Sequence, residues 1–277
     1  MTLGIDIGGT NITLGLVRDG KVVAMEKVRS FPFQSTCEQT LDYLEKQIRK
    51  IITPDITGIG FGVPSVVDVK EGVVYDTANI PSWKEVHLKS RFEEKFGLRV
   101  EVNNDSNCYA LGAYETYPAA SRPESLVAMT LGTGVGMGII NEGKLFTGAN
   151  CGAGELSCLP YNGATIEDFC SKKFFYGNGI DPIAAGEKAL AGDTASLDLF
   201  EEFGRHLGYA VCTILYAYDP EVIVLGGGVA NNYPLFRKDM EVYLCNNFPY
   251  HKAIERLQVD VITRDDIPVL GAASLVK

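Results

Sequence analysis

The sequence predicts an α/β protein built from two related domains. Short apolar runs of strand length alternate with amphipathic helical segments along most of the chain, which is typical of α/β folds. The chain has 277 residues, enough for two domains that each have a core. A glycine-rich pattern near the start also returns at 132–144, and this repeat indicates that the two halves are related.

Composition and charge argue against several classes of protein. The chain is 46% hydrophobic and 22% charged, as in ordinary globular proteins, and its formal net charge is −10. A nucleic-acid partner needs a basic footprint, so we expect none, and we expect no membrane attachment. The seven cysteines are scattered, and the sequence opens on a strand rather than a secretory leader. We therefore expect reduced thiols and a cytoplasmic protein.

The first twenty residues contain a candidate phosphate-binding hairpin. An apolar run over 3–7 includes Asp6, and Gly8-Gly9-Thr10-Asn11 follow before a second apolar run. Glycines let the backbone turn tightly and bring N–H groups close to a bulky anion. Asp6 is placed to meet a metal ion or a metal-bound water. An ordinary glycine-rich hairpin is the alternative, and the pattern is neither a Walker loop nor a dinucleotide fingerprint because a strand follows the glycines.

The next segments alternate between helix and strand. Ser35 and Glu38 predict a capping box at the start of an amphipathic helix that extends to about residue 51. Strand 56–63 then ends in a turn, 62–65, at the carboxyl edge where ligands of α/β sheets bind. A helix over 87–96 and a strand over 99–102 follow.

A cluster of amides with one carboxylate, 103–107, separates strand 99–102 from a helix over 108–115. Asp105 is expected near the helix N-terminus, where a negative charge is favoured. Asp105 or Ser106 could simply cap the helix. One capping side chain is sufficient, however, so the excess of amides also indicates a functional site.

The segment 118–123 is a candidate linker, and strand 126–131 after it begins the second half. Laying 9–21 over 132–144 without gaps pairs Gly9 with Gly132, Thr10 with Thr133, Gly15 with Gly138, Gly20 with Gly143 and Lys21 with Lys144. Asp6 falls on Met129, so only the first hairpin has the carboxylate. We interpret the first hairpin as the binder of metal-bound phosphate and the second as a source of backbone donors, both facing a shared cleft.

The remainder of the second half contains further candidate ligands. Glu155 and Glu167 lie in an irregular region, 146–171, where carboxylates suit the hydroxyls of a polyol; solvated loop carboxylates are the alternative. A long helix over 196–218 has a core-facing stripe. Strand 221–225 ends in Gly226–Gly228, a bare backbone that suits close contact with a nucleotide. A strand over 258–263 and a short helix over 271–276 end the chain.

Short motifs recur along the whole chain in a particular order. They are Asp6–Thr10, Gly62–Pro64, Asn79–Trp83, Asn104–Asn107, Leu131–Gly136, Gly152–Glu155 and Leu225–Val229. Together they resemble the ROK family of sugar kinases and repressors. The resemblance implies a two-domain actin-like ATPase (ribonuclease H-like) fold with an interdomain cleft. Its implied domains are 1–117 and 118–265, with a C-terminal helix at about 266–277 that packs back on the first.

The resemblance also implies an activity. Kinase members transfer the ATP γ-phosphoryl group, with Mg²⁺, to a sugar hydroxyl, usually O6, and repressor members carry an N-terminal helix-turn-helix domain. The start of the sequence at the hairpin favours a kinase. The implied acceptor is glucose or a related hexose such as mannose, fructose, allose or N-acetylmannosamine. The implied assembly is a homodimer.

The resemblance assigns roles to individual residues. Asp105 is the implied general base. The implied sugar ligands are Asn79, Asn104, Glu155, Glu167 and Ser65. The implied ATP- and phosphate-binding residues are Asp6, Gly8, Gly9, Thr10, Asn11, Thr133, Gly134, Gly227 and Gly228. Asp6 would also bind Mg²⁺, directly or through a water.

The sequence departs from the family pattern beside Glu155. Leu156-Ser157-Cys158 stands where a Gly-His pair is usual, and 160–165 replaces the usual zinc cluster, so we expect no zinc. Ser65 also stands where a glycine is usual. These departures leave the sugar open, and a non-catalytic sugar sensor or regulatory protein is the alternative function.

Overall fold

The computed structural model describes all 277 residues, and they form two compact units. Unit 1 comprises Met1–Arg122, Lys144–Ala153 and Arg264–Lys277, and unit 2 comprises Pro123–Gly143 and Gly154–Thr263. The chain therefore passes from one unit to the other more often than the domain bounds implied by the resemblance would require. The segment Lys144–Ala153 belongs to unit 1 because β11 (Lys144–Phe146) contacts α3 and Cys151 lies against Asn103.

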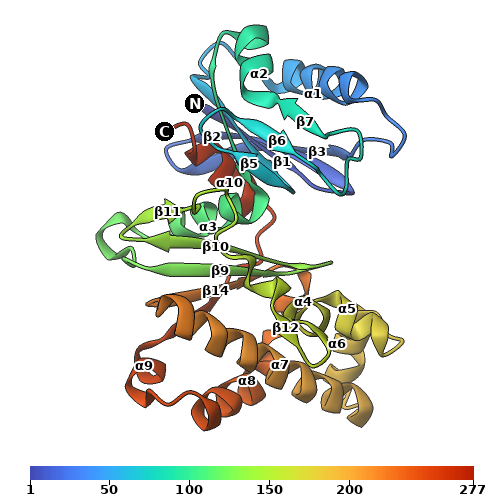
Figure 1. The fold of residues 1–277 in the computed structure, drawn as a ribbon, viewed down its shortest axis with the longest axis vertical. Helices are drawn as coiled ribbons and strands as arrows, with labels where there is room; N and C mark the ends of the chain where they lie inside the picture. The colour runs from blue at the N-terminus through green and yellow to red at the C-terminus, as the bar shows by residue number, and fades with distance from the viewer. The chain divides into compact units, whose positions relative to one another are not determined.

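Unit 1 is organised around a five-stranded mixed sheet with the order β3-β2-β1-β4-β8. The strands β1, β4 and β8 are parallel. The strands β2 and β3, labelled beside β1 in Figure 1, form an antiparallel edge. The carboxyl ends of β1, β4 and β8 consequently meet at one edge of the sheet. The strand bounds are β1 Thr2–Ile7, β2 Asn11–Arg18, β3 Lys21–Arg29, β4 Gly58–Val63 and β8 Arg99–Asn104.

Helices and a small sheet complete unit 1. A three-stranded antiparallel sheet has the order β5-β6-β7. Its bounds and those of the remaining elements are β5 Val66–Asp68, β6 Val73–Tyr75, β7 Glu85–His87, α1 Cys37–Ile51, α2 Leu88–Phe96, α3 Asp105–Glu115, η1 Ala119–Ser121 and α10 Ile267–Ser274.

The capping box of α1 lies one residue later than the sequence predicted. Thr36, not Ser35, accepts from the backbone N–H of Gln39, whose side chain accepts from Thr36 in return. Glutamine closes a capping box as well as glutamate does, so both registers fit the sequence rule. The apolar stripe of α1 packs with Trp83, whose indole Nε1 donates to the buried hydroxyl of Thr40 over 2.6 Å.

The last helix, α10, packs tightly against the sheet and α3 of unit 1. Glycines stand at the contacts: a Cβ on Gly60 of β4 would overlap the carbonyl oxygen of Ala272, and a Cβ on Gly271 would overlap that of Cys108. The backbones of three elements therefore approach one another more closely than any side chain allows. The C-terminal helix implied by the resemblance is thus integral to unit 1.

Unit 2 repeats the strand arrangement of unit 1. Its strands β10-β9-β14-β15 are neighbours in that order, with β9, β14 and β15 parallel and β10 antiparallel to β9. The pair β9–β10 thus corresponds to β1–β2. The last but one residue of β9, which takes the place of Asp6, is Thr130 rather than Met129 as the gapless overlay predicted, and Met129 matches buried Ile5. The bounds are β9 Leu126–Leu131, β10 Val135–Asn141, β14 Val222–Gly226 and β15 Gln258–Val261.

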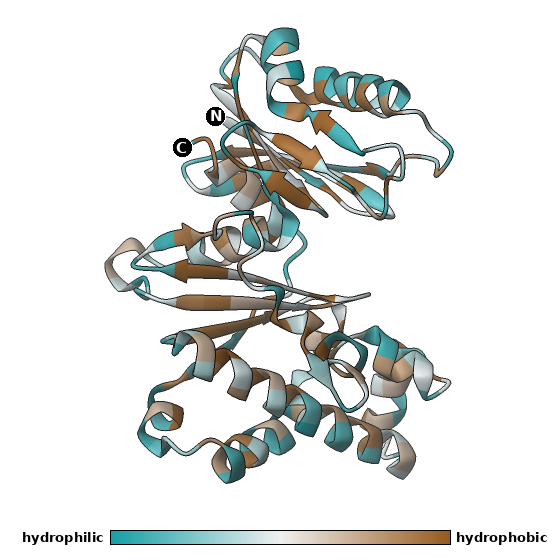
Figure 2. Ribbon diagram, in the orientation of Figure 1, coloured by the Kyte–Doolittle hydropathy of each residue, from teal (hydrophilic) through white to brown (hydrophobic).

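Helices enclose an aromatic core in unit 2. Buried Phe175, Phe200 and Phe203 pack with ring centroids 5.1 Å apart, and Phe236 joins them. Figure 2 shows the strands as the most hydrophobic segments and polar residues along the long helices. No helix combines the length and apolar character needed to cross a bilayer. The remaining bounds are η2 Glu155–Cys158, β12 Pro160–Tyr161, β13 Ala164–Thr165, α4 Ile166–Cys170, α5 Lys172–Gly177, α6 Pro182–Leu190, α7 Thr194–Tyr218, η3 Gly228–Asn232, α8 Tyr233–Asn247 and α9 His251–Arg256.

The close packing of α10 gives a stability prediction. Replacing Gly271 by Ala should lower the free energy of unfolding by about 2 kcal/mol or more, because the new methyl group meets backbone atoms that cannot rotate away. Gly177→Ala is the matched control, since nothing lies within 4 Å of its Cβ position, and it should change stability by less than about 0.5 kcal/mol. Urea denaturation measures both variants. Equal stability of the two would contradict the packing described for α10.

Candidate active site

The predicted site residues of unit 1 lie at the carboxyl edge of its parallel strands. Asp6 precedes the last residue of β1, and Asn104 is the last residue of β8. The turn after β4 brings Ser65 to the same edge, because Val63 pairs with Asn104 in the parallel register. This edge is where ligands bind in open α/β sheets.

The first glycine turn connects β1 and β2 at this edge. The backbone N–H of Gly8 donates to the carbonyl of Asn11 over 2.9 Å and closes the turn. A Cβ on Gly9 would lie 3.4 Å from the side chain of Asn79, and both residues are exposed. The structure therefore places Asn79, from the loop before Trp83, directly beside the candidate phosphate hairpin.

The start of α3 resolves which residue caps the helix. Asn104 is the N-cap: its Oδ1 accepts from the backbone N–H of Ser106 over 2.9 Å and from that of Asn107 over 3.3 Å. Its Nδ2 also donates to the carbonyl of Ser65 over 3.2 Å. Asp105 is the first residue of α3, and its Oδ1 accepts from the N–H of Ser106 over 2.8 Å. The main capping role therefore belongs to Asn104 rather than to Asp105 or Ser106.

Asp6 and Asp105 influence each other electrostatically. Burial, and after it the negative charge of Asp105, raise the pKa of the Asp6 carboxyl to about 7, while Lys27 acts in the opposite direction. Two carboxylates that share a low-dielectric neighbourhood disfavour double ionisation. Such a pair is stabilised by a bound cation or by a proton, and it marks this edge as a candidate functional site.

Buried amides lie under the Asp105 segment. Asn103 Oδ1 accepts from Asn107 Nδ2 over 2.9 Å and from the Cys151 thiol over 3.3 Å. These contacts connect the 147–153 segment to the start of α3. The sequence located Asn103 and Asn107 in the amide cluster but gave no signal for Cys151, because that contact joins segments 48 residues apart.

The second glycine turn, Gly132–Gly134, connects β9 and β10 in unit 2. The N–H of Gly132 donates to the carbonyl of Gly134 over 2.9 Å, and Thr133 between them is exposed. Glu167 braces this turn: its Oε2 accepts from the N–H of Val135 over 3.0 Å, and a Cβ on Gly134 would overlap the same oxygen. Glu167, predicted from the resemblance as a sugar ligand, thus contacts the backbone of the phosphate hairpin.

Lys173 neutralises Glu167. Its Nζ lies 2.6 Å from Glu167 Oε1 and 3.6 Å from Asp168 Oδ1, and the Glu167 contact raises the pKa of the lysine. The sequence analysis missed Lys173, although its spacing from Glu167 across a short helix was visible. This pairing keeps a carboxylate beside the turn without leaving a net negative charge there.

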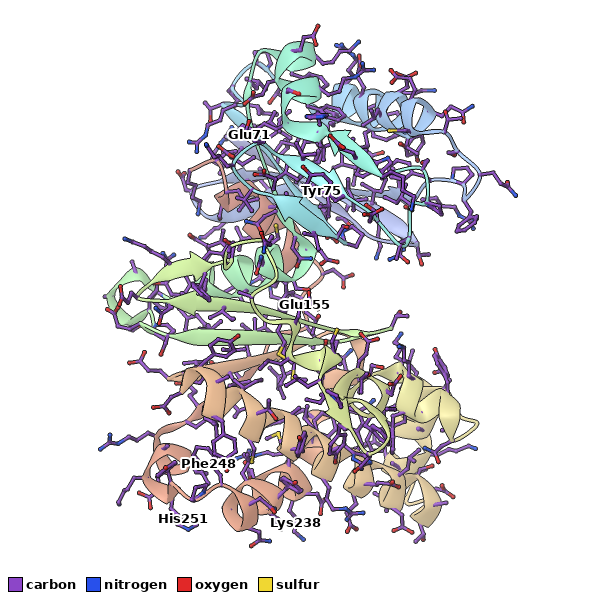
Figure 3. The ribbon with its side chains drawn as sticks, in the orientation of Figure 1. Glu71, Tyr75, Glu155, Lys238, Phe248 and His251 are labelled. Atoms are coloured by element: carbon purple, nitrogen blue, oxygen red, sulfur yellow. The ribbon has the colours of Figure 1, made fainter.

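Glu155 lies apart from these contacts within unit 2. It is exposed and is the first residue of η2 (Figure 3), and its Oε2 accepts from the Cys158 thiol over 3.6 Å. The nearby carboxylate and burial raise the pKa of the Cys158 thiol. Glu155 is therefore available to a ligand, in contrast to Glu167.

The hairpin β12–β13 occupies the region where the resemblance would place a zinc cluster. Tyr161 stacks on Tyr209 with ring centroids 4.2 Å apart, and its hydroxyl lies 2.9 Å from His206 Nδ1. Phe169 packs edge-on against Tyr161 at 5.3 Å. No three His, Cys, Asp or Glu side chains of the chain gather in a metal-binding group. Aromatic packing therefore fixes this hairpin to α7 and α4.

The turn Gly226–Gly228 lies beside the second glycine turn. Gly226 pairs with Thr130 in the parallel register of β14 and β9, and a Cβ on Gly227 would lie 2.5 Å from the carbonyl oxygen of Leu131. Thr133, Gly134, Gly227 and Gly228, all predicted to bind the nucleotide, are thus brought together at the carboxyl edge of the second sheet.

Comparison with known proteins identifies the family. A glucokinase of Thermotoga maritima is 25% identical over 99% of this chain and 96% of its own length. An N-acetyl-D-glucosamine kinase of Aliivibrio salmonicida is 30% identical over 83% of this chain and 85% of its own. The crystal structure of a ROK family glucokinase from Streptomyces griseus, in complex with glucose and AMPPNP, superposes with a TM-score of 0.80 at 27% identity and covers 99% of this chain and 98% of that one. The ROK family model matches residues 2–173 and 161–277, so the chain belongs to the ROK family and has its actin-like ATPase fold, as the motifs predicted.

Proposed function

We propose that this protein is an ATP-dependent hexose kinase in which Asp105 is the general base. The observation that supports this most directly is the pairing of Asp105 with Asp6 at the strand edge that also carries the first glycine turn. Family membership supports the same activity, since relatives include a glucokinase and an N-acetyl-D-glucosamine kinase.

The residues supply what phosphoryl transfer requires. The reaction depends mainly on positioning the two substrates and stabilising charge, with little covalent chemistry by the protein. In the proposed mechanism Asp105 takes the proton of the attacking sugar hydroxyl, which we expect to be O6. Asn79, Asn104, Ser65 and Glu155 orient the sugar, and the backbone N–H groups of the two glycine turns bind phosphate oxygens.

Two predicted sugar ligands also have structural partners. Asn104 caps α3, and its amide holds the Ser65 turn. Glu167 accepts from Val135 and pairs with Lys173, which supports a second role as a brace of the phosphate hairpin. We propose that these residues fix the geometry of the site in addition to any contact with the sugar.

The residues of unit 1 fit a magnesium ion that accompanies ATP. Asp6 is a hard oxygen ligand, and burial together with the charge of Asp105 raises the pKa of its carboxyl, so a cation beside it would stabilise the charged form. Mg²⁺ is typically held by one or two carboxylates together with substrate phosphates and water, so a single protein carboxylate is sufficient. When bound, the ion would neutralise developing charge on the transferred phosphoryl group. Asp6 would hold it directly or through a water.

A panel of sugars tests the substrate class. We expect ADP release above background with at least one of glucose, mannose, fructose, allose, N-acetylglucosamine and N-acetylmannosamine, at millimolar sugar with ATP and Mg²⁺. A coupled spectrophotometric assay measures it. Absence of turnover with every sugar, combined with calorimetric sugar binding, would instead support a non-catalytic sensor.

Asp105→Asn tests the general base. The amide keeps the size of the side chain but cannot accept the proton, so kcat should fall about 10²- to 10⁴-fold while sugar affinity changes only a few-fold. Asp198→Asn, an exposed position on α7, is the control and should retain full activity. Retention of more than half of wild-type kcat by Asp105→Asn would reject the proposed base.

Asp6→Asn tests the electrostatics of the carboxylate pair. The pKa of Asp6 is about 7 in the folded protein and near 3.8 in the unfolded chain, so the folded state binds the proton more tightly. The contribution of this proton to stability is complete below about pH 4 and is lost as pH rises towards 7. Asp6→Asn should therefore match wild type at pH 4 and exceed its stability by about 1–2 kcal/mol at pH 8, a figure reduced for solvent screening.

Melting curves of both proteins from pH 4 to pH 8, without divalent cations, measure this difference. A gap that is constant across the pH range would contradict the raised pKa. Adding Mg²⁺ at pH 8 should raise the melting temperature of wild type more than that of Asp6→Asn.

A further inference from the structure

Two glycine turns of unit 2 form one continuous backbone surface. The strands β9 and β14 are parallel neighbours, so the turns that follow them, Gly132–Gly134 and Gly226–Gly228, lie at the same edge. The tight contact of Gly227 with the carbonyl of Leu131 brings the two turns together. A chain of several phosphate groups needs this kind of extended surface, because its oxygens are spread over more than one turn.

Lys172 spans the two turns. Its backbone N–H donates to the carbonyl of Gly132 over 2.9 Å, which fixes the residue beside the first turn. Its Nζ lies 3.9 Å from the position that a Cβ on Gly228 would occupy, so the half-buried side chain reaches the second turn. The ammonium group thus lies beside the second glycine turn, while the backbone of the same residue is fixed beside the first.

No carboxylate of the protein forms a salt bridge with the Lys172 ammonium group. The adjacent Lys173 pairs with Glu167 and Asp168, whereas Lys172 forms no salt bridge in the structure. Glu167, the carboxylate closest to the Gly134 turn, is already neutralised by Lys173. Lys172 therefore adds an unpaired positive charge to this surface in a protein whose net charge is −10. An anion is the ligand that such a charge favours.

We propose that Lys172 binds the phosphate chain of the nucleoside triphosphate donor. This inference rests on the proposed kinase function and adds a side-chain ligand to a site otherwise built from backbone donors. Lysine suits the role because its ammonium is a point charge with three rotatable donors and can follow a flexible polyphosphate. The ligand class is accordingly a triphosphate rather than a nucleoside alone.

The geometry separates this role from a structural one. The contact that anchors residue 172 to Gly132 is made by the backbone, so any side chain preserves it. Lys172→Met keeps the aliphatic stem and removes only the charge, and Lys172→Arg keeps the charge. Lys238→Met is the matched control, because Lys238, labelled on α8 in Figure 3, is exposed and forms no salt bridge.

The test is calorimetric binding of ATP, inorganic tripolyphosphate and adenosine, each with Mg²⁺, by these variants. In Lys172→Met the dissociation constants of ATP and tripolyphosphate should rise about 10- to 100-fold, while that of adenosine stays within twofold of wild type. Lys172→Arg should recover most of the lost affinity, and Lys238→Met should match wild type. Equal ATP affinity in Lys172→Met and wild type would overturn the proposal.

Binding and turnover distinguish the two proposals. If wild type binds ATP but phosphorylates no sugar, the kinase proposal fails and Lys172 is still judged by the binding data. If wild type is an active kinase and Lys172→Met has an unchanged KM for ATP, only the role of Lys172 is rejected. If wild type binds neither ATP nor tripolyphosphate, both proposals are overturned.

Discussion

Close approach of backbone to backbone is the constraint on which the rest of this structure depends. In unit 1, α10 reaches the sheet and α3 only because Gly60 and Gly271 have no Cβ. In unit 2, the turns Gly132–Gly134 and Gly226–Gly228 meet because Gly227 has none. The same steric rule therefore shapes both the core and the candidate site. Glycine weakens an isolated element, and here tertiary packing over the contact offsets that weakness.

The candidate-site carboxylates of the two units lie in different electrostatic surroundings. Burial and the negative charge of Asp105 both raise the pKa of the Asp6 carboxyl, so it takes up a proton more readily than an ordinary aspartate. Glu167 is compensated by Lys173 and by an N–H of the turn that it supports. A buried carboxylate that feels a second negative charge is stabilised by a cation, whereas a carboxylate paired with a lysine acts as a rigid acceptor. This difference follows the asymmetry of the repeat, in which the position of Asp6 on β1 is taken on β9 by Thr130, which has no charge.

The sequence predicted the architecture better than it predicted the contacts of individual side chains. Strand, glycine turn and second strand are local patterns, so both hairpins were located correctly from the chain alone. Long-range contacts could not be predicted in this way, because they depend on which segments the fold brings together. Examples are the contact of Cys151 with Asn103 and the position of Lys172 beside Gly228. The capping box at Thr36 was predicted one residue early, because Ser35 with Glu38 and Thr36 with Gln39 both fit the capping-box pattern.

The position of α10 has a consequence for how the chain folds. The helix that completes unit 1 is made of residues 267–274, whereas the sheet and the helix that it packs on lie within the first 115 residues. During synthesis the N-terminal half emerges with the apolar surface that α10 covers still open to solvent. Unit 1 therefore cannot reach its final packing until unit 2 has been translated. Unit 1, whose first strand is made earliest, is thereby the unit that completes its packing last.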